Sequence, residues 1–188
     1  MMEGKPMDEE TLAELSNSIK TREIDKIFCK GFFPKNILYF GEDNFKPFII
    51  WHLPKAKRNL SFKKSLEIKN GMYNLPALVF KLKNDTLSVF AIKDDNLKDD
   101  TILYKAPFHN VYEDGRICMG NAIIKKNNEL NVIVKNYEDA FFMSEFSHYM
   151  NQGSPIKKNL NIYFEKLKTN EFDNSLLINH KLKLKDLL

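Results

Sequence analysis

The segment Asn110–Met119 contains the residues of this chain best suited to chemistry. Its sequence is NVYEDGRICM, in which Cys118 follows Asn110 by eight positions and Gly115 by three. A cysteine thiolate is a good nucleophile and a good leaving group at neutral pH, which suits covalent catalysis. An asparagine amide can stabilise an oxyanion, or it can hold a turn by bonding to its own backbone. A cysteine in an apolar run is, by itself, more often a small buried hydrophobe than a nucleophile.

The elements that precede this segment are predicted from hydrophobic patterning. Residues Asp8–Ile27 carry apolar side chains at roughly helical spacing, with acidic residues at the end that a helix dipole favours. From Gly31 onward, short aromatic and β-branched runs separated by Gly, Asn and Asp predict an antiparallel meander. Lys83–Thr86 has the composition of a hairpin turn between two of these runs. The predicted strands cover residues 37–40, 48–51, 77–82, 87–92 and 101–104.

The elements that follow the cysteine are predicted to be mainly helical. Leu130–Val134 has the composition of a short strand, and Tyr137–Met150 has apolar side chains close to one helical face. A second helix is predicted from Pro155, with Ser154 as its N-cap. The leucine-rich last twenty residues are compatible with strand or helix. The order of helix, meander, irregular loop and helices predicts an α+β fold.

The cysteine segment resembles the active-site segment of ubiquitin-conjugating enzymes. In that family an asparagine, a turn with glycine, a β-branched residue, the catalytic cysteine and an apolar residue follow in this order and spacing. Here these positions are Asn110, Gly115, Ile117, Cys118 and Met119. The wider sequence is most similar to the divergent bacterial branch typified by PRTRC system protein B. That similarity covers residues 28–150 and is strongest in residues 75–80, 87–92 and 103–112.

The resemblance implies a fold, an activity and partners. The expected fold is that of ubiquitin-conjugating enzymes: N-terminal helix, antiparallel meander, active-site loop and C-terminal helices. Cys118 would accept a ubiquitin-like protein as a thioester and pass it to an amine, with Asn110 as the supporting hydrogen-bond donor. The partners would be a ubiquitin-like protein, an adenylating activating enzyme and an acceptor protein, with no cofactor. The supporting loop would comprise Phe108, His109, Tyr112, Asp114 and Gly115.

The sequence also departs from the family pattern. Ubiquitin-conjugating enzymes usually have His-Pro before the asparagine, but here Phe108 and His109 occupy those positions. No acidic residue can be assigned to the position that helps to deprotonate the incoming lysine, and Asp114 is a candidate substitute. His109 is expected to be structural, with general-base or loop-ordering roles as alternatives. These departures favour an alternative function, a catalytically inactive scaffold in a plasmid or mobile-element-associated (PRTRC) complex.

Composition excludes several other classes. The 188 residues carry a formal net charge of +4, almost entirely from lysine, which argues against a dedicated nucleic-acid binder. Two cysteines cannot build a disulfide framework or a four-thiolate zinc site, and the histidines have no metal-ligand spacing. Three lysine pairs are expected to be solvated surface, with a docking patch for an acidic partner as the alternative. These pairs are Lys63-Lys64, Lys125-Lys126 and Lys157-Lys158.

The chain is expected to be a single domain with three parts. They are an N-terminal helical segment (residues 1–27), a ubiquitin-conjugating-like core (28–155) and a C-terminal helical extension (156–188). No apolar stretch is long enough to span a membrane, and the charged opening is not a signal peptide. A cytoplasmic location is therefore expected, where a carrier thiol stays reduced.

Overall fold

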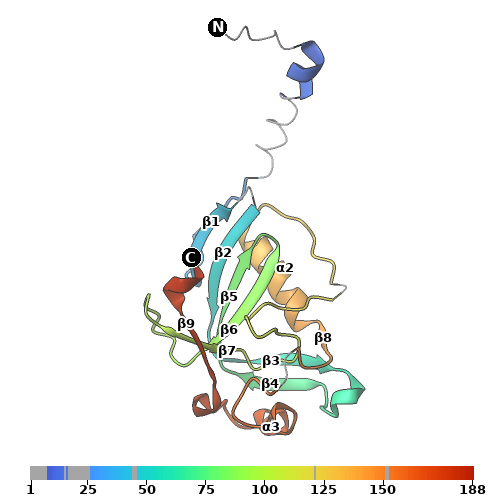
Figure 1. The fold of residues 1–188 in the computed structure, drawn as a ribbon, viewed down its shortest axis with the longest axis vertical. Helices are drawn as coiled ribbons and strands as arrows, with labels where there is room; N and C mark the ends of the chain where they lie inside the picture. The colour runs from blue at the N-terminus through green and yellow to red at the C-terminus, as the bar shows by residue number, and fades with distance from the viewer. Residues whose placement is uncertain (1–7, 15, 17–25, 44–45, 121, 151–152) are drawn as a thin grey trace.

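A six-stranded antiparallel sheet forms the body of the molecule (Figure 1). The computed structural model describes residues 8–14, 16, 26–43, 46–120, 122–150 and 153–188. The predicted α+β class is confirmed, and so are the predicted runs of the meander. Asn84 and Asp85 make the tight turn between two strands with φ of 51° and 62°, as a type I′ hairpin requires. The strands, in spatial order, are β1 (Ile37–Asp43), β2 (Lys46–Leu53), β5 (Ala77–Lys83), β6 (Thr86–Ile92), β7 (Ile102–Lys105) and β9 (Asn179–Lys183).

A second, three-stranded sheet was not expected from the sequence. It consists of β4 (Gly71–Leu75), β3 (Ala56–Phe62) and β8 (Glu145–Phe146), in that order. The sequence of β3, AKRNLSF, is too polar to stand out as a strand, although Leu60 and Phe62 are buried in the core. β8 pairs in parallel with the end of β3, and so brings the chain that follows α2 beneath the cysteine segment.

The first helix after the cysteine corrects two predictions. Leu130–Val134 is not a strand, because it forms the first turns of α2 (Leu130–Phe142). Ile133, Tyr137 and Phe141 of this helix are buried at spacings of four, the pattern of a helix face packed on a core. The predicted helix Tyr137–Met150 ends at Phe142, because the chain then extends to form β8.

The second helix starts later than predicted. α3 (Leu160–Leu167) is capped by Asn159, whose side chain accepts a hydrogen bond from the Ile162 backbone amide at 3.2 Å. Ser154 and Pro155 do not start it, since Ile156 instead forms an isolated bridge with Leu177. The region predicted as a C-terminal helical extension holds α3 and two short 3₁₀ turns, η2 (Asn174–Leu176) and η3 (Leu184–Leu187), but also β9.

The predicted N-terminal helix is confirmed at its start, whereas Lys26 and Ile27 at its predicted end are not helical. Residues 9–14 and 16 are helical, and the Asp8 carboxylate accepts a hydrogen bond from the Thr11 amide at 2.8 Å. The described residues of this helix are exposed. Most of the rest of the predicted helix lies outside the described residues.

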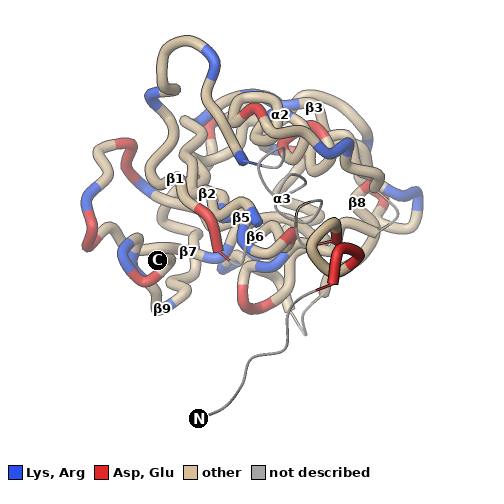
Figure 2. The backbone as a smooth tube through the Cα atoms, turned by 90° about the horizontal axis from the view of Figure 1, so that it is seen from above, with Lys and Arg blue, Asp and Glu red and all other residues tan. Residues whose placement is uncertain are grey.

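The large sheet is buried on both faces. On one face Trp51 and Phe80 stack with their ring centres 5.3 Å apart, in a core shared with α2 and α3. On the other face Ile50 and Val79 belong to a smaller cluster that includes Leu187 of η3. Lysines and arginines are interspersed with acidic residues along the chain (Figure 2). Among the described residues, no helix is both long and apolar enough to span a membrane.

Candidate active site

The cysteine segment folds as a small hairpin, here called the cysteine hairpin (residues 110–118). Val111 bridges to Ile117, and the Cys118 amide donates to the Asn110 carbonyl at 2.8 Å. Val111 and Ile117 are buried. Because alternate residues of a strand point to opposite faces, Asn110, Tyr112 and Cys118 share the other face.

Backbone hydrogen bonds join the cysteine hairpin to β6. The Ile117 amide donates to the Leu87 carbonyl, and the Val89 amide donates to the Gly115 carbonyl, each at 2.8 Å. Gly115 has a φ of +87°, and a Cβ atom there would lie 2.5 Å from the Phe90 ring. Both conditions require glycine at this position. The backbone before the cysteine is therefore held at a fixed distance from the sheet.

The turn of the cysteine hairpin is held by local contacts and by β9. The Asp114 carboxylate pairs with Arg116, with 2.6 Å between Oδ2 and Nε, and accepts the Arg116 amide. Asp114 is not among the residues that line the cleft described below. His180 of β9 packs edge-on against Phe90, and its Nε2 lies 3.0 Å from the Glu113 carbonyl oxygen. The contacts of Asp114 with Arg116 are confined to this turn, so Asp114 acts here as a turn residue.

Asn110 is buried and fastens the cysteine hairpin to the chain after α2. Its amide nitrogen donates to the Glu145 carbonyl at 3.3 Å. Its side-chain oxygen accepts from the Ser147 backbone amide at 3.1 Å and from the Ser147 hydroxyl at 3.3 Å. One of its two amide N–H groups is therefore engaged by the protein itself.

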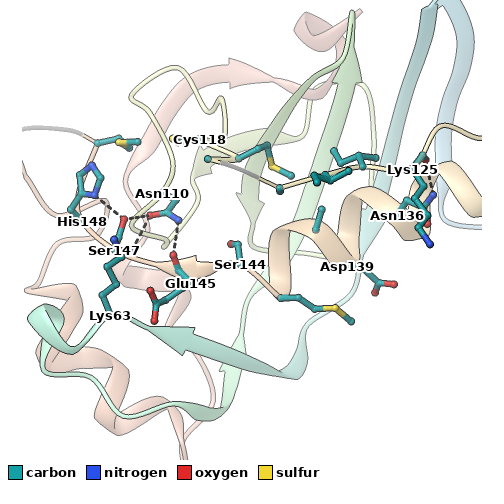
Figure 3. Close-up of a pocket in the computed structure, with 18 residues that line it drawn as sticks. Lys63, Asn110, Cys118, Lys125, Asn136, Asp139, Ser144, Glu145, Ser147 and His148 are labelled. Atoms are coloured by element: carbon teal, nitrogen blue, oxygen red, sulfur yellow. Dashed lines mark hydrogen bonds between the residues drawn. The ribbon is translucent and has the colours of Figure 1, made fainter.

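Cys118 is partly exposed and lines an open cleft of about 960 Å³. Residues 119, 120 and 122–125 line one part of the cleft, and α2 and the segment after it line another. Two apolar side chains at its margin, Ile123 and Met143, are 93% and 77% exposed. Figure 3 shows Asn110 between Cys118 and the pair formed by Ser147 and His148. The cleft thus offers a thiol, apolar walls and a polar end.

Tyr112 lies beside the thiol. A hydrogen bond with Cys118 is the largest cause that raises the pKa of the Tyr112 hydroxyl. The Arg116 guanidinium carbon lies 5.5 Å from the centre of the Tyr112 ring, within the range of a cation–π contact. The sequence analysis included Tyr112 in the supporting loop, and the structure brings it to the cysteine.

Phe108 and His109 lie in the core beneath the cleft. Phe108 packs edge-on against Phe141, with ring centres 5.0 Å apart. His109 is fully buried, stacks on Tyr149 at 4.7 Å, and has its Nε2 atom 2.8 Å from Asn161 Oδ1. Burial lowers the pKa of His109, which favours the neutral ring. This placement agrees with a structural role for His109.

Ser147 and His148 were not predicted from the sequence as part of the site. The Ser147 hydroxyl lies 2.8 Å from His148 Nδ1, and both residues line the cleft with Cys118. No spacing in the sequence indicates this, because Asn110 and Ser147 meet only through the pairing of β8 with β3. Among the described residues, no group of three or more histidine, cysteine or carboxylate side chains could hold a metal ion.

Comparison with known families gives a match over most of the chain. The family model described as "Prokaryotic E2 family D" matches residues 11–183, which is most of the chain. E2 denotes the ubiquitin-conjugating class, so the match agrees with the resemblance of the cysteine segment. It does not test the narrower similarity to PRTRC system protein B. No curated protein and no solved structure matches the chain.

Proposed function

The chain belongs to prokaryotic E2 family D, and we propose that it carries a ubiquitin-like protein as a thioester on Cys118 and transfers it to an amine. One observation supports this function best. Cys118 is partly exposed in an open cleft, at the end of a hairpin that is fixed to β6 on one side and to the Asn110 contacts on the other. A nucleophile held on rigid elements loses little freedom when it reacts.

The proposed reaction has two steps. The Cys118 thiolate attacks the activated C-terminal carbonyl of the ubiquitin-like protein, and the thiol of the adenylating enzyme leaves. An acceptor amine then attacks the Cys118 thioester, an amide forms, and Cys118 leaves as the thiol. In this proposal the second N–H of Asn110 donates to the oxyanion of this step. ATP is consumed upstream, so the carrier needs no cofactor. The proposed location is the cytoplasm, where thiols stay reduced.

The cleft supports the proposal in a second way. The extended C-terminus of a ubiquitin-like protein must reach the sulfur, and apolar side chains at the margin of the cleft, including Ile123 and Met143, can pack against it. The proposed partners are therefore the ubiquitin-like protein, its adenylating enzyme and an acceptor protein.

The test is adduct formation with a ubiquitin-like protein and an adenylating enzyme from the same genome, supplied with ATP. The unaltered chain should form an adduct that thiol reductants cleave. Cys118→Ser should form an ester that survives reductant and is cleaved by alkali, and Cys118→Ala should form no adduct. Cys29→Ser is the control and should form the normal thioester, because Cys29 lies outside the cleft.

A scaffold function gives a different result. In that case the unaltered chain would bind the ubiquitin-like protein without forming an adduct, and Cys118→Ala would bind it equally well. An adduct that persists in Cys118→Ala would contradict the assignment of Cys118 as the carrier.

A further inference from the structure

A chain of three polar side chains ends at the cleft. The Ser147 hydroxyl donates to Asn110 Oδ1 at 3.3 Å and lies 2.8 Å from His148 Nδ1. Asn110 is buried, whereas His148 is exposed on the segment that follows β8. The backbone carbonyl of Asn110 accepts the Cys118 amide at 2.8 Å. Two residues, Ser147 and Asn110, therefore connect the histidine to the backbone of the cysteine.

The direction of these hydrogen bonds determines which histidine nitrogen carries the proton. A serine hydroxyl has one hydrogen, and here it is donated to Asn110 Oδ1, an atom that can only accept. With the Ser147 hydrogen assigned to Asn110 Oδ1, the Ser147 oxygen accepts from Nδ1–H of the neutral His148 ring, and the tautomer follows from that assignment. Nε2 of the same ring is then the unprotonated nitrogen, which can accept a proton.

Other ionisable groups in the cleft are less suited to accept a proton. The Asp139 carboxylate is paired with Lys135 at 2.6 Å. Lys63 and Lys125 also line the cleft, and a lysine ammonium group has donors but no acceptor. Glu145 is exposed and lines the cleft, so it is the one described carboxylate there that competes with His148.

We propose that His148 is the general base of the transfer step, an inference that rests on the proposed thioester function. Nε2 of His148 takes a proton from the acceptor amine as its nitrogen attacks the thioester carbonyl of Cys118. The C–N bond forms and the C–S bond breaks. The proton on the imidazolium then passes to the leaving sulfur or to water, which restores the neutral ring and the Cys118 thiol. His148 would thus take the place of the acidic residue that helps to deprotonate the incoming lysine, which could not be assigned in this sequence.

Ser147 and Asn110 are positioning residues in this scheme. Ser147 sets the tautomer and the orientation of the His148 ring. The side-chain oxygen of Asn110 in turn holds Ser147, because it accepts from both the backbone amide and the hydroxyl of Ser147. Residues that fix a catalytic histidine in this way contribute by positioning its ring and do not themselves transfer a proton in the reaction.

The experiment separates loading of Cys118 from discharge of the loaded thioester. The preloaded protein is mixed with free lysine or with hydroxylamine, which is already unprotonated at neutral pH and needs no base. His148→Gln should load normally but discharge to lysine about 10²-fold more slowly, the lower part of the range for general-base catalysis. Discharge to hydroxylamine should keep its rate. A histidine that only supports the structure would slow both acceptors equally.

The controls keep failures distinguishable. Glu145→Gln should discharge to lysine at the normal rate, and Ser147→Thr should retain more lysine activity than Ser147→Ala. Normal lysine discharge in His148→Gln, or a selective loss in Glu145→Gln instead, would overturn the role of His148 while leaving the carrier function intact. Failure of the unaltered chain to load would count against the carrier function, and His148 would then have no transfer step to serve.

Discussion

Tyr112 and Cys118 share one face of the cysteine hairpin, and their interaction raises the pKa of the Tyr112 hydroxyl. The two residues lie on the same face because Val111 and Ile117 occupy the buried face of the hairpin. Tyr112 is 39% exposed and is not among the residues that line the cleft, so its ring leaves the cleft open. The pKa of the Tyr112 hydroxyl therefore depends on the Cys118 thiol.

The first prediction concerns the ionisation of Tyr112. Its pKa is raised, first by the hydrogen bond with Cys118 and then by the charge of the ionised sulfur. Cys118→Ala removes both causes, so the pKa of Tyr112 should fall towards the ordinary value of about 10. NMR titration of ring-labelled tyrosine measures it, with Tyr112→Phe to assign the signal. An unchanged titration curve in Cys118→Ala would show that the two groups do not interact.

The second prediction concerns Asn110. Replacing it with alanine removes three hydrogen bonds and leaves the Glu145 carbonyl and the Ser147 amide, both in part-buried hydrogen bonds, without this partner. The free energy of unfolding should fall by about 1–3 kcal/mol. Urea unfolding followed by the fluorescence of Trp51, the single tryptophan and fully buried, measures this. The matched control is Asn131→Ala on α2, which should change stability by less than about 0.5 kcal/mol.

The third prediction compares two glycines of positive φ. Gly115→Ala should destabilise the protein by about 1–3 kcal/mol, because backbone strain is added to a collision with the Phe90 ring. Gly120 has a φ of +54° but open space around it, so Gly120→Ala should cost about 1 kcal/mol from strain alone. The measurement is urea unfolding of both variants. Equal losses would mean that the contact with Phe90 is unimportant.

The fourth prediction concerns acid stability. Burial lowers the pKa of His109 in the folded state, so the unfolded chain binds the proton more readily. The contribution of His109 is complete above the unfolded value of 6.5, and it is lost as the pH falls below 6.5 towards the folded-state value. Glu138 has the opposite effect on the pH dependence of stability. Burial raises the pKa of its carboxyl group, so the folded chain binds this proton more readily than the unfolded chain.

Comparison with His109→Phe isolates the effect of the histidine. The variant should be less stable than the unaltered chain near pH 7, because Asn161 loses a partner, but its stability should fall less between pH 7 and pH 5.5. Urea unfolding across this range gives both curves. If the two curves of stability against pH run parallel, protonation of His109 is not coupled to unfolding.

Much of the meander was predictable because its signals are local. The apolar runs of β5 and β6 flank Asn84 and Asp85, whose residue types suit the left-handed turn that the structure contains. The start of α2 was not predictable in the same way. Leu130–Val134 has β-branched residues that favour a strand, but burial of Ile133 and Val134 against the sheet selects a helix.

The candidate site was predictable where residues are close in sequence. Asn110, Gly115 and Cys118 belong to one short hairpin, so their spacing carries the signal. Ser147 and His148 reach the cleft through the parallel pairing of β8 with β3. This pairing involves only two residues of each strand, too few to leave a recognisable pattern in the sequence. The burial of His109 depends on rings from distant elements, among them Tyr149 and Phe164, and no local property of its sequence determines it.

The pairing of β9 with β7 has a consequence for the order in which the molecule folds. Ile102 meets Lys183 across a loop that contains the cysteine hairpin, α2 and α3, whereas β5 and β6 are joined by a two-residue turn. Closing a long loop costs more chain entropy than closing a short one, and contacts of high sequence separation slow folding. We expect β9 to join the sheet late. The contact between His180 and Glu113 then makes the turn before the cysteine one of the last parts of the chain to become ordered.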